Sequence, residues 1–231
     1  MIPRCACAAA VVIVAASAAG AAAQDDLFPR GRIIGSVEIP ALHGEASRGA
    51  AEPARSKPVT LYTQPVTGAR AMTVVRNQSQ VLSVEHGSEQ VSAGVVEIRT
   101  QGDRRWYRVQ FQVGNWIGAG WLAPRDAGAY HPLASTLRNG LPFLTESWDG
   151  SLYSAPNATA KRRAVRRTRA EQDVRVLSTS GDGAHLWLRV QILDHSPCDG
   201  SGAAPNVVAT GWMPAYSRDG RIAAWHHSRG C

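Results

Sequence analysis

The sequence predicts an all-β protein of two tandem small β-barrels with irregular inserts. Three short motifs occur twice and in the same order, which indicates two copies of one structural unit. The motifs at 61–65, 106–110 and 120–122 return at 152–156, 187–191 and 211–213. Short stretches of alternating apolar and polar residues, separated by Gly-, Asp- and Ser-rich turns, predict closely spaced strands. No long amphipathic helix pattern is present, so small antiparallel barrels fit best.

The spacing of the motifs indicates where the two copies differ in length. The outer motifs are offset by 91 residues and the middle one by 81. Copy one therefore has about ten extra residues before Trp106, and copy two has about ten extra residues after Trp187. Surface loops tolerate such insertions. We expect a first domain at 33–130 with a flexible insert at 44–58, a linker at 131–140, and a second domain at 141–231 with an insert at 192–210.

Two fainter similarities suggest how each copy begins and ends. Residues 39–42 (Ile-Pro-Ala-Leu) are similar to residues 141–144 (Leu-Pro-Phe-Leu). Near the other end, Tyr130-His131 is similar to Trp225-His226.

The motif containing the first Trp has the pattern of a half-buried strand in both copies. Leu186, Leu188, Val190 and Ile192 fall on one face of such a strand, and the alternate residues fall on the other. Copy one has the same alternation, with Tyr107, Val109, Phe111 and Val113 on the apolar face. We therefore expect these residues to face the core of each domain.

The first 23 residues have the pattern of a secretory signal peptide. Arg4 forms a basic start, 8–19 is apolar, and Ala21-Ala22-Ala23 resembles a cleavage site. The alternative is an uncleaved membrane anchor, for which the apolar stretch is short. No second long apolar run follows, so we expect a periplasmic or secreted protein that does not span the membrane after cleavage.

Two cysteines, Cys198 and Cys231, remain after cleavage. An even count in an oxidising compartment predicts one disulfide between them. The alternative is a redox-active or nucleophilic cysteine, which the absence of a Cys-x-x-Cys motif disfavours. In the chain-entropy model, a disulfide closing a loop of this size contributes roughly 3–4 kcal/mol.

The chain carries 25 Lys and Arg against 18 Asp and Glu, a formal net charge of +7. A basic exported protein is attracted to anionic surfaces, but charge also serves solubility alone. One segment concentrates the charge, with six cations in nine residues: Lys161, Arg162, Arg163, Arg166, Arg167 and Arg169. They predict an anion-binding edge or, alternatively, a solvated edge strand whose cations discourage aggregation. The signal peptide argues against a nucleic-acid partner.

The order of the motifs resembles the bacterial SH3-like domain. The similarity consists of Leu-Tyr…Pro, then Trp-x-Arg-Val, then Gly-Trp, over residues 59–124 and 150–216. It implies two SH3-like barrels, and members of this family mostly recognise cell-wall peptides or partner proteins. The Leu-Tyr start and the insert at 192–210 depart from the family pattern, so the ligand does not carry over directly.

The polar faces of the motif strands contain the best candidate ligand residues. These are Trp106, Arg108 and Gln110 in copy one and Trp187, Arg189 and Gln191 in copy two. An exposed Trp beside Arg and Gln suits peptide or sugar recognition; the alternative is that each Trp packs against the other copy or an insert. Tyr62 and Tyr153 are weaker candidates at the groove border, as are Trp121 and Trp212, which are more often core residues.

No catalytic motif, cofactor motif or metal-ligand spacing is evident. A Cys–His hydrolase built from Cys198, His195 and His226 is the least favoured hypothesis, because a Gly- and Pro-rich insert is a poor place for a nucleophile. We therefore expect a non-catalytic binding protein of the cell envelope that recognises a peptide, a cell-wall fragment or a protein partner, without metal or cofactor. The alternative is a structural scaffold subunit of an envelope complex.

Overall fold

The computed structural model describes residues 32–42, 57–86, 90–169, 171–200 and 202–227. The predicted signal peptide at 1–23, nearly all of the predicted insert at 44–58, and Cys231 lie outside the described residues. The signal peptide and the Cys198–Cys231 disulfide therefore remain predictions.

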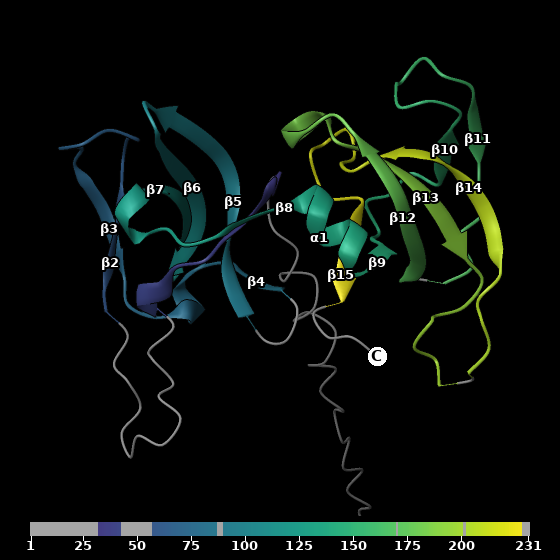
Figure 1. Ribbon diagram of the computed structural model, residues 1–231, viewed down its shortest axis with the longest axis horizontal. Coiled ribbons are helices and arrows are strands. Elements are labelled where there is room, and N and C mark those ends of the chain that lie inside the picture. The colour runs from purple at the N-terminus through teal and green to yellow at the C-terminus, as the bar shows by residue number, and fades with distance from the viewer. Residues whose placement is uncertain (1–31, 43–56, 87–89, 170, 201, 228–231) are drawn as a thin grey trace, which may run out of the picture.

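The protein contains two antiparallel β-sheets that lie side by side (Figure 1). Unit one consists of β1 (Gly35–Val37), β2 (Val59–Tyr62), β3 (Ala71–Val75), β4 (Ser83–His86), β5 (Gln90–Gln101), β6 (Arg104–Val113), β7 (Trp116–Leu122) and β8 (Tyr130–Pro132). Unit two consists of β9 (Leu141–Leu144), β10 (Ser151–Tyr153), β11 (Arg162–Ala164), β12 (Gln172–Ser180), β13 (Trp187–Leu193), β14 (Val207–Pro214) and β15 (Ala224–His227). The all-β prediction is confirmed, whereas closure of the sheets into barrels remains a prediction.

The two sheets have the same strand order. Unit one runs β3-β2-β7-β6-β5-β1-β8, with β4 added beside β5, and unit two runs β11-β10-β14-β13-β12-β9-β15. The register also agrees: Trp121 pairs with Tyr62 and Arg108, and Trp212 pairs with Tyr153 and Arg189. The repeated motifs thus correspond to the same strands in each unit.

Close packing explains why glycine precedes the last motif Trp in both copies. A Cβ atom on Gly120 would lie 2.9 Å from Leu61 Cβ, and one on Gly211 would lie 2.8 Å from Leu152 Cβ. Carbon atoms do not approach so closely without a shift of the backbone or the neighbour. The missing side chain of the motif Gly thus leaves room for the motif Leu in each unit.

A β-bulge also recurs at the same place. The pairing of β5 with β6 shifts between Val95 and Glu97, and the pairing of β12 with β13 shifts between Val176 and Ser178. In each unit the shift lies opposite the motif Arg-Val, where it bends the longest strand of the sheet.

Each unit has its own hydrophobic core. The alternation predicted for the motif strands is confirmed, since Leu186, Leu188, Val190 and Ile192 are all buried in the core of unit two. The predicted core residues of copy one behave similarly: Tyr107, Val109 and Phe111 are buried and Val113 is partly buried.

The extra residues of the two copies take different forms. In copy one they fall in the stretch that forms the short 3₁₀ helix η2 (Gln78–Gln80) and β4, a strand that unit two lacks among its described residues. In copy two they form the loop at 194–206 between β13 and β14, so the expected insert at 192–210 is shorter than predicted and its ends belong to the strands.

The stretch predicted as a linker contains the helix α1 (Leu133–Asn139), whose Leu133 and Leu137 are buried in the core of unit two. The similarity between 39–42 and 141–144 is not structural, because Pro40–Leu42 forms the 3₁₀ helix η1 whereas Leu141–Leu144 is strand β9. The strand equivalent to β9 is β1. None of the helices in the described ranges is long and apolar enough to cross a membrane.

The first described residues join the two units. The Tyr216 hydroxyl donates to the carbonyl of Ile33 at 2.6 Å, and the Ile34 carbonyl accepts both from the Tyr130 hydroxyl and from the Leu133 amide, each at 3.0 Å. Helix α1 lies between the sheets and contacts strands of both (Figure 1). The units are thus held together by buried polar and apolar contacts.

Candidate ligand-binding groove

An open groove of about 620 Å³ lies on unit one. Tyr62 and Trp106 lie in it, and three connecting segments surround them: 66–68 between β2 and β3, 101–104 at the turn between β5 and β6, and 123–125 after β7. We call this the Tyr62–Trp106 groove.

The aromatic side chains of the groove are packed more tightly than the sequence suggested. Trp106 is only 5% exposed, so the prediction that it is an exposed residue is wrong. It forms a second small cluster with Trp121 and Ala123, against which Tyr62 packs. The Tyr62 ring meets the Trp106 ring edge to face, with centroids 6.0 Å apart. The pattern of alternation correctly separates Trp106 from the main core, but neighbouring strands supply a second apolar layer on the other face.

The rim of the groove is charged. Nη2 of Arg125 donates to the Tyr62 hydroxyl at 2.9 Å, and Nε of Arg125 lies 3.6 Å from a carboxylate oxygen of Asp126. Asp103 and Arg104 are exposed and, within the described residues, have no ion-pair partner. Neither Arg104 nor Arg125 was a candidate from the sequence. The sequence signal for Arg125 was the comparison of the two copies, since Arg125 occupies the position of Tyr216 in copy two.

The other two predicted ligand residues of copy one lie on the same strand as Trp106. Arg108 is exposed, and its Nη1 lies 3.5 Å from Glu97, which also binds Arg99 at 2.7 Å. Gln110 is partly buried. Neither lines the Tyr62–Trp106 groove, so of the predicted residues of copy one the structure brings together only Tyr62 and Trp106.

Unit two repeats the aromatic pair with a more open surface. Tyr153 and Trp187 meet edge to face with centroids 5.4 Å apart, and Trp187 and Trp212 are both partly exposed. Arg189 is exposed, and Gln191 accepts a hydrogen bond from Arg175 at 3.4 Å. The equivalent of Arg125 is Tyr216, which is buried and faces the junction with unit one instead of a groove.

The predicted anion-binding edge divides into two groups. Lys161, Arg163 and Arg166 are exposed, the first two at or beside the edge strand β11. Arg162, Arg167 and Arg169 also make contacts within the fold, so anion binding by this edge stays a prediction. Arg162 donates to the Ser151 hydroxyl at 2.7 Å, and its guanidinium lies 3.9 Å from Asp149.

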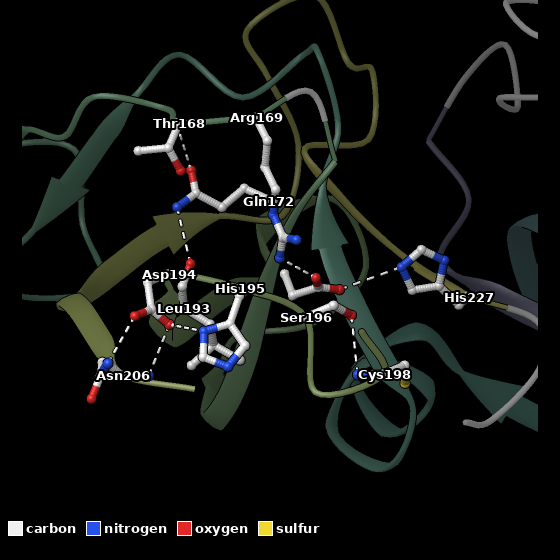
Figure 2. Close-up of polar contacts among 11 residues, drawn as sticks. Thr168, Arg169, Gln172, Leu193, Asp194, His195, Ser196, Cys198, Asn206 and His227 are labelled. Carbon is white, nitrogen blue, oxygen red and sulfur yellow. Dashed lines mark hydrogen bonds and ion pairs between the residues drawn. The ribbon is translucent and has the colours of Figure 1, made fainter. Parts of the chain in front are cut away.

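Arg167 and Arg169 stabilise the region around them. Arg167 donates to the carbonyl of Thr145 and lies over the Trp148 ring, 5.9 Å from its centroid. Burial lowers the pKa of Arg167, an effect that Glu146 opposes. Figure 2 shows Arg169 and His227 on either side of a carboxylate, that of the buried Asp173; Arg169 forms an ion pair with it, and Nε2 of His227 lies 3.4 Å from it.

The residues of the hydrolase hypothesis lie in two different elements. His195 belongs to the hairpin after β13, and its two ring nitrogens lie 2.6 Å from Asp194 and 3.4 Å from the carbonyl of Ala203 (Figure 2). His226 is buried on β15, with its ring against Trp225. The backbone and side-chain amides of Asn206 each donate to Asp194, and these hydrogen bonds lower the pKa of Asp194. No group of three or more His, Cys, Asp or Glu side chains suited to a metal is found among the described residues.

No protein-family model, curated protein or solved structure matches this chain. Its candidate function therefore depends on the groove itself.

Proposed function

We propose that this chain is an exported, non-catalytic binding protein of the cell envelope, which recognises a peptide or a cell-wall fragment through the Tyr62–Trp106 groove. The observation that carries the proposal is an open groove of about 620 Å³ with aromatic side chains and a charged rim. Concave sites with apolar walls and a few polar groups are typical of ligand-binding sites. The predicted signal peptide supports the envelope location, and the resemblance to bacterial SH3-like domains supports a binding role.

The proposal is tested by sedimentation of residues 24–231 with purified peptidoglycan sacculi. The variant Thr67→Glu places a long, negatively charged side chain in the exposed turn that lines the groove. Its matched control is Thr210→Glu, the same change at an exposed position of β14 in unit two. We expect wild type and Thr210→Glu to sediment with the sacculi and Thr67→Glu to remain in the supernatant. Wild type that stays soluble at low salt would contradict cell-wall binding and leave a protein partner as the leading hypothesis.

A scaffold role is the second candidate, because both units expose an apolar pair at equivalent positions. Trp116 and Ile117 are 50% and 53% exposed, and Val207 and Val208 are 44% and 49% exposed. Side chains of this kind are buried at stable protein interfaces. A photo-crosslinking residue at position 116 would form a discrete adduct with a partner protein in intact cells, whereas the same residue at the exposed polar position 157 would not.

A further inference from the structure

The charges of the Tyr62–Trp106 groove are unequal. Two guanidinium groups, those of Arg104 and Arg125, line the groove together with one carboxylate, that of Asp103. The other lining residues are neutral, and Asp126, outside the lining, lies 3.6 Å from Nε of Arg125. Exposed guanidinium groups that line an open site favour an anionic group on its ligand.

Arg125 is oriented by the floor of the groove. Its Nη2 donates to the Tyr62 hydroxyl at 2.9 Å, while the side chain remains 74% exposed. A guanidinium has five N–H donors, so the contacts with Tyr62 and Asp126 leave the others available. The Tyr62 bond restricts the position of the guanidinium, which reduces the entropy lost when a ligand binds.

Arg104 lies at the start of β6, where it pairs with Gln101 across the turn that carries Gly102 at a φ of 61°. Gly102 is suited to this left-handed conformation, which keeps the turn tight. Arg104 has no ion-pair partner among the described residues, so its charge is available to a ligand. Asp103 precedes it in the same turn and offers a carboxylate to a cationic group.

We infer that the groove selects ligands that carry a carboxylate, which Arg104 and Arg125 bind while the ligand packs against Tyr62 and the small exposed part of Trp106. Arginine binds carboxylates through paired, charge-assisted hydrogen bonds, which are stronger than bonds between neutral groups. The ligand class is a short peptide with a free carboxylate, from its C-terminus or from an acidic side chain. This inference rests on the proposed function, because it specifies the ligand of the same groove.

The test compares peptides that differ only in this group. ¹⁵N-labelled protein, residues 24–231, is titrated with acetyl-Ala-Ala-Ala as the free acid, with the same peptide as its amide, and with acetyl-Ala-Glu-Ala-amide. Dissociation constants are measured from chemical-shift changes of the Trp106 indole N–H. We expect the free acid to bind about tenfold more tightly than the amide. The third peptide shows whether a side-chain carboxylate substitutes for the C-terminus.

The preference for the acid is the ratio of the dissociation constant of the amide to that of the free acid. The variants Arg104→Gln and Arg125→Gln should each reduce this ratio towards one. Both positions are exposed, so thermal unfolding should not change. Arg99→Gln is the matched control, because Arg99 is an exposed arginine of β5 outside the groove lining. It should keep the full preference, and the preference should weaken with added salt.

Equal binding of all three peptides, blocked by Thr67→Glu, would overturn the carboxylate inference and leave the groove as a binding site. If both Arg104→Gln and Arg125→Gln keep the preference for the acid, these arginines do not bind the carboxylate, and the inference is wrong. No binding of any peptide, while sacculi still sediment with wild type, would also contradict it. If wild type binds neither the peptides nor the sacculi, the proposed function is contradicted as well.

Discussion

The two units share strand order, register, bulge and motif glycine, yet they differ at the residue that follows the last motif by three positions. In unit one this residue is Arg125, which lines an open groove and donates to Tyr62. In unit two it is Tyr216, which is buried and donates to the Ile33 carbonyl at the junction. The same position of the repeat thus lines a groove at the surface of unit one and makes a contact between the units in unit two. A repeated fold lets one copy carry packing while the other is free to vary its surface.

The largest expected difference between the units concerns the motif tryptophans. Trp106 is buried between Trp121 and Ala123, whereas Trp187 is partly exposed. Trp106→Ala should lower the free energy of unfolding by about 3–5 kcal/mol, because it empties a packed site, and Trp187→Ala by roughly half as much. Urea unfolding followed by far-ultraviolet circular dichroism measures both without relying on the removed fluorophore. Equal decreases in the free energy of unfolding would contradict a dependence on the different burial of Trp106 and Trp187, since the two aromatic clusters would then contribute equally to stability.

The junction between the units gives the next largest effect. Tyr216→Phe removes a hydroxyl that bonds the Ile33 carbonyl in a buried position, and should cost about 1–3 kcal/mol. Tyr130→Phe should cost less, because the Ile34 carbonyl keeps its bond from the Leu133 amide. Thermal unfolding of the two variants provides the comparison. A larger loss from Tyr130→Phe would contradict the importance assigned to Tyr216.

The repeat and the core strands were predictable from the sequence because they depend on local patterns. Alternation identified Leu188, Val190 and Ile192 as core residues, and the recurrence of Gly-Trp located the equivalent strand of each unit. The burial of Trp106 was not predictable in this way, since it requires that β2 and β7 bring Tyr62 and Trp121 beside it.

The groove was only partly predictable for the same reason. Tyr62 and Trp106 were candidates, but Arg104 and Arg125 come together only because segments distant in sequence surround one opening. Helix α1 escaped detection because seven residues are too few for a periodic pattern. The cation-rich run was visible in the sequence, but local composition could not reveal that Arg167 and Arg169 are used within the fold.

The junction should also lose stability at alkaline pH. Burial, assisted by the neighbouring Tyr107, raises the pKa of Tyr130 to about 12, and burial raises the pKa of Tyr216 further. In the unfolded chain a tyrosine loses its proton near pH 10, so the folded state binds more protons above that pH. The free energy of unfolding should therefore be unaffected by these groups below pH 10 and fall between pH 10 and 12.

For the partly exposed Tyr130 we expect a loss of about 1 kcal/mol after allowing for solvent screening. Urea unfolding at pH 9, 10 and 11 measures how the free energy of unfolding changes with pH. The variants Tyr130→Phe and Tyr216→Phe should each show a shallower decline than wild type, because the titrating group is absent. A decline equally steep in both variants would assign the alkaline loss to other groups.

The smallest expected difference concerns the motif arginines on the open faces of the sheets. Arg108 lies 3.5 Å from Glu97, whereas the residue paired with Arg189 at the equivalent bulge is Ser178. Because Arg108 is exposed and Glu97 is partly exposed, their ion pair should contribute about 0.2–1 kcal/mol, decreasing with salt. Arg108→Gln should show this loss in 20 mM salt and little of it in 1 M salt, while Arg189→Gln should be insensitive to salt. Similar salt dependence in both variants would contradict a specific role for Glu97.

A double variant tests whether Glu97 binds two arginines. Arg99 lies closer to Glu97 than Arg108 does. If the carboxylate binds both arginines, the double variant Arg99→Gln, Arg108→Gln should lose more free energy of unfolding than either single variant.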